Sequence, residues 1–256
     1  MKPQLPCHDD WQNKTVWVTG ANQGIGAETA NQFQQLGAQV IGFDLHFDSP
    51  NDNITQVVLD ISNESAIRSI CELLIKKHGA VDILVNVAGI LHMGSIMELT
   101  VEQWTSSFNV NVSGAFHLMR QVIPLMKVNK SGAIVSVSSN ANHMPRMSMA
   151  AYSASKSALT NLTLVAGIEL AKYGIRCNVV SPGSTQTPMQ WSLWQDEHGE
   201  EETIEGFPKQ FKPGIPLGKL ATPADIANSV VFLSSSQASH ITLQDIVIDG
   251  GATLGK

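Results

Sequence analysis

Tyr152 and Lys156 are the two residues whose types and spacing most directly indicate chemistry. Residues four apart in a helix lie on one face, so the phenol and the ammonium are neighbours if this segment is helical. A positive charge beside a phenol favours the phenolate and lowers its pKa from about 10 toward the working range. Tyr152 could then serve as a general base. The pair alone is weak evidence, because tyrosine and lysine also pack on ordinary helix faces.

Ser139 adds a third polar group to this pair. It follows the apolar run 133–137 and precedes Tyr152 by thirteen residues. A strand that ends at this point would bring the hydroxyl group of Ser139 to the edge of the sheet near Tyr152, where it could hold a substrate oxygen. The combination of the three residues is therefore more specific than the spacing of Tyr152 and Lys156.

A glycine-rich segment, Thr19–Gly26 (TGANQGIG), lies between an apolar run and a helical pattern. Glycine at such a turn lets the backbone approach a pyrophosphate, and the N-terminus of the following helix supplies N–H groups. Glycine-rich turns are common, and the spacing here is G-x-x-x-G-x-G, so the strand–turn–helix context carries the assignment. The residues expected to contact a dinucleotide are Gly20, Gln23, Gly24, Ile25 and Gly26.

Asp44 closes the second predicted strand, where an acid can bind the adenosine ribose hydroxyls of a dinucleotide. A carboxylate at this position repels a 2′-phosphate, and neither Gln23 nor Leu45 offers a positive charge to bind one. These features predict NAD rather than NADP. The alternative interpretation of Asp44 is an ordinary turn residue at a strand end.

Two further turns follow the third and fourth predicted strands. Asp60-Ile61 could flank an adenine ring, and Asn86–Gly89 (NVAG) ends the fourth strand. In an open α/β sheet, ligands bind beyond the carboxyl ends of the strands, so these turns should line one crevice. The residues expected there are Asp60, Ile61, Asn86, Ala88 and Gly89.

Apolar runs alternate with helical patterns along the chain. Strands are expected at 15–19, 39–43, 54–59, 83–87, 133–137, 175–180 and 246–248, and helices at 24–36, 64–78, 100–127, 151–173 and 222–233. This order predicts an α/β fold with a doubly wound, mostly or wholly parallel sheet of about seven strands and helices on both faces. The helix over 100–127 could be kinked where Pro124 approaches its end.

The chain is expected to form one domain over residues 14–256, preceded by a flexible polar tail at 1–13. Residues 187–215 lack a clean period and are rich in proline, which is typical of a mobile lid over a substrate. The segment includes Trp191, Trp194 and Phe207, aromatic residues that could equally belong to a subunit interface.

Composition excludes several classes of protein. With 43% hydrophobic and 15% charged residues the chain is not disordered, and its net charge of −6 without a basic cluster argues against nucleic-acid binding. No stretch approaches the ~20 apolar residues that span a bilayer, and the polar start does not resemble a signal peptide. The three cysteines lack a CxxC motif and are expected to be buried apolar side chains. A cytoplasmic enzyme fits these features.

From about Lys14 onward the sequence resembles the short-chain dehydrogenases/reductases. The matching residues are those of Thr19–Gly26 and Asn86–Gly89, together with Asn111, Ser139, Tyr152, Lys156, Pro182, Gly183 and Thr187. The resemblance implies a Rossmann domain that binds a nicotinamide cofactor, a homotetramer, and a catalytic tetrad of Asn111, Ser139, Tyr152 and Lys156. Val87 stands where the family's usual NNAG motif has its second asparagine, and only a local effect is expected.

The resemblance also implies individual roles. Asn111 would hold a water that links Lys156 to solvent, and Lys156 would bind the nicotinamide ribose. Thr187 and the backbone near Val180 would bind the carboxamide, with Pro182 and Gly183 in the same part of the cofactor site.

Three segments resemble one branch of this family, the enzymes that oxidise 2,3-dihydro-2,3-dihydroxybenzoate during bacterial catechol siderophore synthesis. They are 142–147, 181–193 and 239–255, and 88–94 supports them; Leu243 in the last segment is informative because many relatives carry glycine there. The alternatives are a family member that acts on another cyclic alcohol or ketone, and a non-catalytic NAD-binding protein. A non-catalytic protein would be expected to lose Tyr152, Lys156 or Ser139.

A substrate of this kind carries a carboxylate, and Arg146 is the candidate to bind it. Arg146 lies between Ser139 and Tyr152, and a guanidinium can bind a carboxylate through two hydrogen bonds. The alternative is an ion pair at the surface or at a subunit interface. Met189, with Met144, Met147 and Met149, could form an adaptable wall against the ring or pack in the core. His143 is a weaker candidate for the site.

Overall fold

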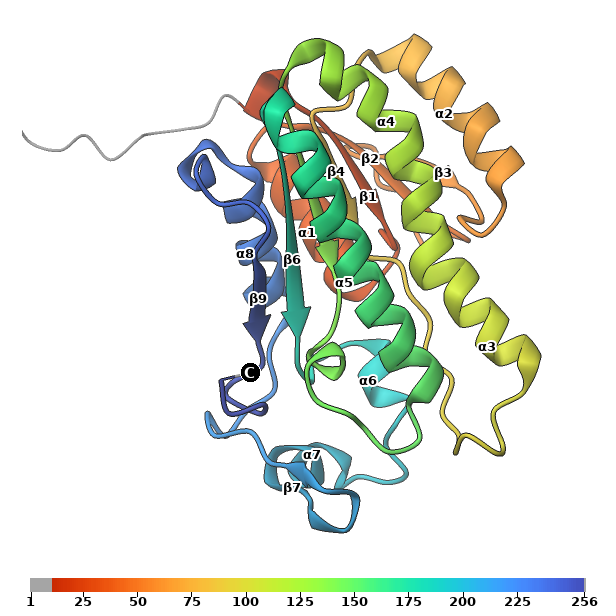
Figure 1. Ribbon diagram of the computed structural model, residues 1–256, viewed down its shortest axis with the longest axis vertical. Coiled ribbons are helices and arrows are strands. Elements are labelled where there is room, and N and C mark those ends of the chain that lie inside the picture. Colours follow the sequence, from red (N-terminus) through yellow and green to blue (C-terminus); the bar gives the residue numbers. More distant parts are fainter. Residues whose placement is uncertain (1–10, 256) are drawn as a thin grey trace, which may run out of the picture.

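Seven parallel strands form the central sheet of the computed structural model, which describes residues 11–255 (Figure 1). The strands are β1 (Thr15–Thr19), β2 (Gln39–Asp44), β3 (Thr55–Val58), β4 (Ile83–Asn86), β5 (Gly132–Val137), β6 (Ile175–Pro182) and β9 (Asp245–Ile248). Their order across the sheet is β3-β2-β1-β4-β5-β6-β9, and every pair is parallel. The predicted doubly wound parallel fold is therefore confirmed. The winding reverses between β1 and β4, the position where such sheets bind ligands.

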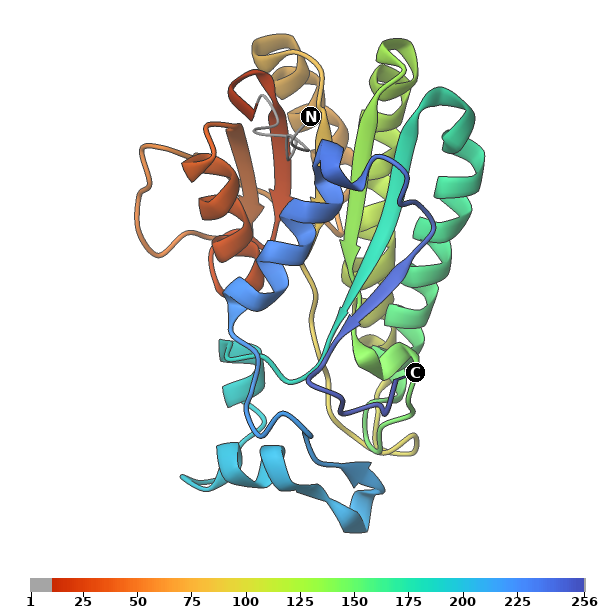
Figure 2. The same ribbon diagram turned by 90° about the vertical axis from the view of Figure 1, so that its left-hand side faces the viewer.

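Helices cover both faces of this sheet. Figure 2 shows α1 and α8 in front of the strands, whereas α2, α4 and α5 lie on the opposite face (Figure 1). The longer helices are α1 (Gly24–Gln35), α2 (Glu64–His78), α3 (Val101–Phe108), α4 (Ala115–Asn129), α5 (Ala150–Leu170) and α8 (Pro223–Ser234). Within residues 11–255, no helix has both the length and the apolar character needed to cross a membrane.

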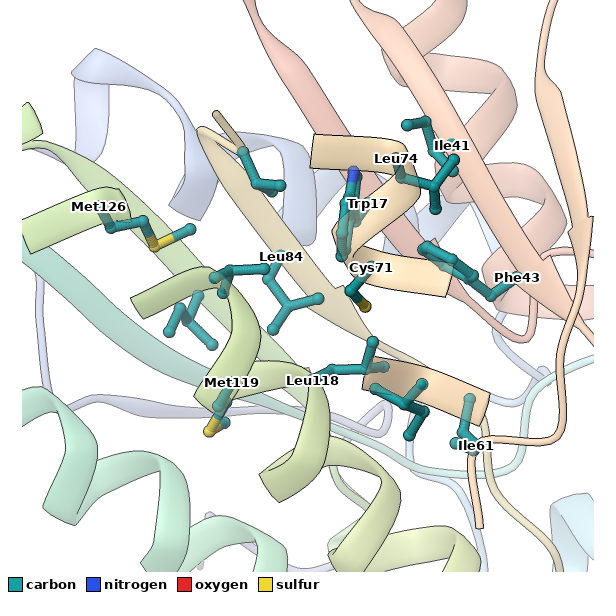
Figure 3. Close-up of a cluster of buried hydrophobic side chains, with 14 of the residues drawn as sticks. Trp17, Ile41, Phe43, Ile61, Cys71, Leu74, Leu84, Leu118, Met119 and Met126 are labelled. Atoms are coloured by element: carbon teal, nitrogen blue, oxygen red, sulfur yellow. The ribbon is translucent and has the colours of Figure 1, made fainter. Parts of the chain in front are cut away.

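The strand sequences supply two cores, one on each face. Val16 and Val18 of β1 pack in the core under α1 and α8, while Trp17 between them packs in the core under α2 and α4. Figure 3 shows Trp17 in this second core with Phe43 and Leu118. Because successive side chains of a strand point to opposite faces, a strand covered on both sides must be apolar throughout. This explains why the strands read as continuous apolar runs rather than as alternating patterns.

Local capping chemistry sets the ends of the helices. Thr222 caps α8 as predicted: its hydroxyl accepts the N–H of Asp225 at 3.2 Å, the Asp225 carboxylate accepts the N–H of Thr222 at 2.8 Å, and Pro223 is the first helical residue. Asn63 caps α2, which ends at Gly79 with a φ of 84°. These caps give the two helices definite limits on opposite faces of the sheet.

The segment expected as one helix over 100–127 is interrupted. Its middle is a π-helix, η2 (Asn109–Gly114), between α3 and α4, whereas Pro124 lies inside α4. The interruption therefore lies before Pro124, and the kink expected at Pro124 stays a prediction. Gly114 lies against Ile61, since a Cβ on this glycine would be 2.7 Å from the Ile61 Cδ1 atom. Tertiary contacts of this kind, which have no local sequence pattern, accompany the widened turn.

Residues 187–215 are more ordered than their composition indicated. They contain α6 (Pro188–Trp191), α7 (Gly199–Glu205) and an antiparallel ribbon of β7 (Gly206–Phe207) and β8 (Lys212–Pro213). Figure 2 shows α7 and the ribbon beyond the carboxyl ends of the central strands. The segment is thus placed where a lid would lie, but it is built from short regular elements.

The expected N-terminal tail is only partly described, because residues 1–10 lie outside the described residues. Trp11–Asn13 form a 3-10 turn, and the buried Trp11 ring packs edge-on against Phe33 with 5.4 Å between centroids. Trp11 thus belongs to the folded core while Gln12 and Asn13 are exposed, so the boundary of the tail at residue 13 was set too late.

Leu243 has an unusual backbone conformation. Its φ is 63°, and its N–H donates to the Cys177 carbonyl at 2.8 Å as the chain enters β9. Its side chain packs against Gly167 of α5, where a Cβ would lie 2.6 Å from the Leu243 Cδ2 atom. A left-handed non-glycine residue costs about 1–3 kcal/mol and persists only where its surroundings hold it.

We predict that Ile67→Ala lowers the free energy of unfolding by about 2–5 kcal/mol, because Ile67 is completely buried in the core under α2. The matched control is Leu73→Ala on the same helix, whose side chain is exposed and should change stability by about 0.5 kcal/mol or less. Urea unfolding of the two variants measures the difference. Equal losses would contradict the assignment of this face of α2 to the core.

Candidate active site

A cavity of ≈ 450 Å³ opens at the carboxyl ends of the central strands, bounded by the glycine turn, the loops after β4, β5 and β6, and the 187–215 segment. The sequence-predicted residues that line it are Gly20, Gln23, Gly24, Ile25, Gly26, Asp44, Asp60, Ile61, Ala88, Gly89, Ser139, Arg146, Tyr152, Lys156, Pro182, Gly183, Thr187 and Met189. Two predicted residues, Asn86 and Asn111, do not line it. The parallel sheet therefore brings segments that are far apart in sequence to one crevice.

The glycine turn has room for a ligand because side chains are absent from it. Gly20 has a φ of 69°, and a Cβ there would lie 3.0 Å from the Cα of Ala88. A Cβ on Gly24, whose φ is 57°, would lie 3.1 Å from the methyl group of Thr187. A Cβ on Gly26 would lie 2.0 Å from the carbonyl oxygen of Gly20. This bare turn at the start of α1 fits the pyrophosphate of a dinucleotide.

Thr19 holds the glycine turn to the loop after β4. Its hydroxyl oxygen accepts hydrogen bonds from the N–H groups of Val87 at 2.9 Å and Ala88 at 3.0 Å. Asn86 itself points away from the crevice. Its buried side chain donates from Nδ2 to the hydroxyl of Ser136 at 3.3 Å, between β4 and β5. The predicted direct contact of Asn86 with a cofactor therefore remains an expectation that its position does not favour.

Asp44 lines the cavity at the end of β2. Its two carboxylate oxygens accept the N–H groups of Asn22 at 2.9 Å and of Leu45 at 2.8 Å. These bonds fix the carboxylate at the rim, and each oxygen keeps a lone pair for another donor. Asp60 is held in its turn by Ser62, whose N–H and hydroxyl donate to Oδ1 at 2.8 and 2.7 Å.

Tyr152 and Lys156 lie one turn apart on α5, as their spacing predicted. The Lys156 nitrogen is 5.8 Å from the centroid of the Tyr152 ring. Burial raises the pKa of Tyr152, and the hydrogen bond from the Ser139 side chain opposes this shift. The predicted lowering of the Tyr152 pKa by Lys156 is therefore wrong for the protein alone, because desolvation of the phenolate outweighs the neighbouring groups.

Lys156 is the most deeply buried cation of the site. Its ammonium donates to the Val137 carbonyl at 2.8 Å, and burial lowers its pKa to about 8. Gly89 packs against it, since a Cβ on Gly89 would be 3.2 Å from the Lys156 nitrogen and 3.2 Å from Oδ1 of Asn111. A side chain at position 89 would therefore require Lys156 or Asn111 to shift.

The side chain of Asn111 holds the backbone rather than facing the cavity. Its Oδ1 accepts the N–H of Ile90 at 2.8 Å, and its Nδ2 donates to the Ile90 carbonyl at 3.0 Å and to the Ser155 hydroxyl at 2.9 Å. These bonds fasten the π-helix to the loop after β4 and to α5. Both N–H donors of the side-chain amide are occupied, so a water held by Asn111 would have to donate to an oxygen, either Oδ1 or the main-chain carbonyl.

Arg146 reaches the cavity from the loop between β5 and α5. It is half-buried, and its Nη1 has no hydrogen-bond partner within the described part of the chain. No ion pair joins Arg146 to a carboxylate among residues 11–255, whereas the alternative of an ion pair at a subunit interface is untested. Burial lowers its pKa, and the charge of Asp249 opposes this. The site therefore presents a partly desolvated guanidinium with hydrogen-bonding capacity to spare.

The other candidates divide between the cavity and the core. Met147, Met149 and Met189 line the cavity, whereas Met144 does not. His143 instead contacts Asp245, with Nε2 at 2.8 Å from Oδ2. Trp194 packs against the small core of Ile215, Leu220 and Ala252 and donates to the Thr203 hydroxyl at 3.2 Å.

Sequence reasoning missed Lys212, which lines the cavity from β8. No motif or spacing marks this lysine, and only the pairing of the ribbon brings it to the site. Among residues 11–255, no group of three or more histidine, cysteine or acidic side chains is placed to hold a metal ion.

Residues 20–253 match the profile of the family described as enoyl-(acyl carrier protein) reductase. A 2,3-dihydro-2,3-dihydroxybenzoate dehydrogenase of Escherichia coli is 51% identical over 246 residues, covering 96% of this chain and 99% of that protein. A vibriobactin-specific enzyme of the same name from Vibrio cholerae is 43% identical over 253 residues, covering 94% and 97%. The solved structure of ElxO with NADP bound superposes with a TM-score of 0.82 at 27% identity, covering 95% and 99%.

We predict a specific pH dependence of stability from Lys156. A buried lysine whose pKa is about 8 binds fewer protons than the unfolded chain between pH 8 and its ordinary value of 10.5. Its destabilising effect is complete below pH 8 and is lost as the pH rises through this range, by up to about 1.4 kcal/mol per pH unit. Relative to Lys156→Met, the wild-type protein should therefore gain stability as pH increases.

Unfolding free energies of wild type and Lys156→Met between pH 7 and 10.5 provide the measurement. Subtraction of the two curves removes the titration of all groups that the proteins share. If the stability of the wild type relative to Lys156→Met stayed constant or fell as the pH rose, this result would be inconsistent with the burial of the ammonium.

Proposed function

Because the chain belongs to the short-chain dehydrogenase/reductase family, we propose that it oxidises 2,3-dihydro-2,3-dihydroxybenzoate to 2,3-dihydroxybenzoate with NAD. The observation that carries this proposal is the cavity that joins the Tyr152–Ser139 pair to the unpaired guanidinium of Arg146. A cyclic diol acid needs both features, a base for its hydroxyl group and a cation for its carboxylate. Close, nearly full-length similarity to the Escherichia coli enzyme supports the same substrate.

The proposed chemistry begins with the substrate hydroxyl group held by Ser139 and Tyr152. Tyr152 as phenolate takes the hydroxyl proton while the hydrogen on the same carbon leaves as hydride. The bound nicotinamide supplies the hydride acceptor, and its positive charge favours the phenolate. The dienone that remains tautomerises to the aromatic catechol acid, which makes the oxidation strongly downhill. The residues of this chain mainly need to position the reacting atoms.

Lys156 and Asn111 assist the transfer of the substrate proton from Tyr152 to solvent. The ammonium of Lys156, 5.8 Å from the Tyr152 ring centroid, stabilises the phenolate and is placed to bind the nicotinamide ribose. A water on an oxygen of Asn111 would link Lys156 to solvent, since both N–H donors of the Asn111 amide are already used by Ile90 and Ser155. Protons released by Tyr152 would leave the closed site along this route.

The cofactor is proposed to be NAD rather than NADP. Asp44 stands at the end of β2 with its carboxylate fixed by two N–H groups, where the adenosine ribose would lie. Accommodation of a 2′-phosphate would place two negative charges together at this rim. The carboxamide end would lie against Thr187, whose methyl group already packs on the glycine turn.

The product is proposed to enter a catechol siderophore, in line with the vibriobactin-specific relative. We also propose a homotetramer, formed through α4, α5 and the C-terminal segment. Exposed apolar side chains support these surfaces: Phe116 and Val128 on α4, Val165 and Ile168 on α5, and Leu254 near the end of the chain.

Purified protein incubated with NAD and the dihydrodiol acid should produce NADH and fluorescent 2,3-dihydroxybenzoate in equal amounts. Tyr152→Phe should lower kcat by about 10²–10⁴-fold, because it removes the general base. Tyr173→Phe alters the chain's other tyrosine, which contacts Lys127 and Lys172, and should leave kcat unchanged. Turnover of an unrelated alcohol without turnover of the dihydrodiol acid would refute the substrate assignment.

The cofactor assignment predicts that kcat/KM with NAD exceeds that with NADP by roughly 100-fold, since like charges at one rim cost several kcal/mol. Asp44→Asn should reduce this ratio by about 10-fold while keeping the size of the side chain. The control is Asp48→Asn, an exposed neighbour that accepts from the side chain of Asn22 and should not alter the ratio. A wild-type enzyme that favours NADP would overturn the assignment.

A further inference from the structure

Two cationic side chains, Arg146 and Lys212, line the same cavity although they come from distant parts of the chain. Arg146 belongs to the loop between β5 and α5, and Lys212 begins β8 of the ribbon in the 187–215 segment. Burial lowers the pKa of Lys212 to about 8, and the positive charge of Arg146 lowers it in the same direction. The two side chains are therefore electrostatic neighbours inside the cavity.

Neither cation has an acidic partner of its own within residues 11–255. No carboxylate lies within ion-pair distance of either side chain, and the Nη1 atom of Arg146 has no hydrogen-bond partner. Asp249 is the acid whose charge acts on Arg146. Its carboxylate is already committed, since it accepts from Asn140 at 3.1 Å, Gly251 at 2.9 Å and Thr253 at 2.8 Å.

The ribbon holds Lys212 in this position. Lys212 pairs with Phe207 across the ribbon, and its ammonium lies 5.1 Å from the centroid of the Phe207 ring. Gly206 at the start of the ribbon has a φ of 93°, and a Cβ there would be 2.4 Å from the nitrogen of Gly214. The close contact of these glycines sets the course of both strands, so the lysine reaches the cavity from a defined backbone.

We propose that Lys212 is a second ligand of the substrate carboxylate, which is held between the Lys212 ammonium and the Arg146 guanidinium. Two like charges without a counter-ion repel each other in a partly desolvated cavity. A single carboxylate bound between them would offset this repulsion and pair with both cations. The pair therefore selects an acid over a neutral ring of the same shape. This inference rests on the proposed function, because it names how that function's substrate is recognised.

The contact also ties the 187–215 segment to the body of the protein. A carboxylate that bridges Lys212 and Arg146 joins the ribbon to the loop before α5, which carries Tyr152. An acidic ring would thus be oriented at the end opposite its reacting carbon. Binding energy from a remote group can position the reacting atoms in this way.

The test compares two ligands that differ only in the carboxylate, 2,3-dihydroxybenzoate and catechol, in titrations of the full-length protein with NADH. Lys212→Met should weaken binding of the acid by about 10–100-fold, the range of a charge-assisted hydrogen bond, and leave binding of catechol unchanged. Lys212→Arg should restore most of the loss. Lys209→Met changes an exposed lysine close to the ribbon that does not line the cavity, and it should bind both ligands as the wild type does.

A double-mutant cycle with Arg146→Met then tests whether the two cations act on one group. We expect the combined loss to differ from the sum of the separate losses, because each cation binds the same carboxylate. Equal weakening of acid and catechol by Lys212→Met, or no weakening of either, would overturn the proposal. NADH binding, followed by its fluorescence, verifies that each variant is folded.

The outcomes separate this proposal from the proposed function. If the wild type discriminates the acid from catechol and Lys212→Met abolishes the discrimination, the carboxylate site stands even without turnover of the dihydrodiol acid. If the acid is turned over but Lys212→Met retains wild-type discrimination, the function stands and the role of Lys212 is refuted.

Discussion

The contact between the glycine turn after β1 and the loop after β4 is the constraint on which the site depends. Thr19 accepts two N–H groups from that loop, and Gly20 approaches Ala88 so closely that no side chain fits between them. The two loops leave neighbouring strands at the point where the winding of the sheet reverses, and their junction forms the floor of the crevice. Thr19 anchors this loop at Val87 and Ala88. The next residue, Gly89, packs against the buried ammonium of Lys156.

The electrostatics of the crevice are dominated by desolvation. Burial raises the pKa of Tyr152 and lowers that of Lys156, so in the protein alone both groups are driven toward their neutral forms. The ionised forms of this pair are stabilised most when a cationic ring and a polar substrate enter the site. These ligands supply the charges and hydrogen bonds that solvent no longer provides. The same argument applies to Arg146 and Lys212, which both line the cavity and have no ion-paired carboxylate among residues 11–255. The cavity is therefore preorganised for charged partners.

Local patterns predicted the parts of this protein that obey local rules. The apolar runs located the strands, the cap at Thr222 located α8, and the residues singled out by the Tyr152–Lys156 spacing and by the glycine turn line one cavity. Sequence-based prediction fails where contacts between residues distant in the sequence determine the structure. The π-helix around Asn111 accompanies bonds to Ile90 and Ser155, the cation at Lys212 depends on the pairing of a two-residue ribbon, and the sign of the Tyr152 pKa shift depends on burial. The orientation of Asn86 also depends on a distant contact, since its side chain donates to Ser136 between β4 and β5, and its contact with a cofactor stays a prediction.

The contact between Leu243 and Gly167 limits which amino acids can replace either residue. The leucine occupies a left-handed conformation that favours glycine, and its side chain fills the space that the missing side chain at Gly167 leaves on α5. The two positions therefore share one volume across the contact between α5 and the start of β9. A chain that exchanged Leu243 for glycine would relax its backbone but open a void beside α5, and one that enlarged Gly167 would have to give up the leucine. Substitutions at these positions are coupled, so that the sequence can move between the two solutions only by changing both residues.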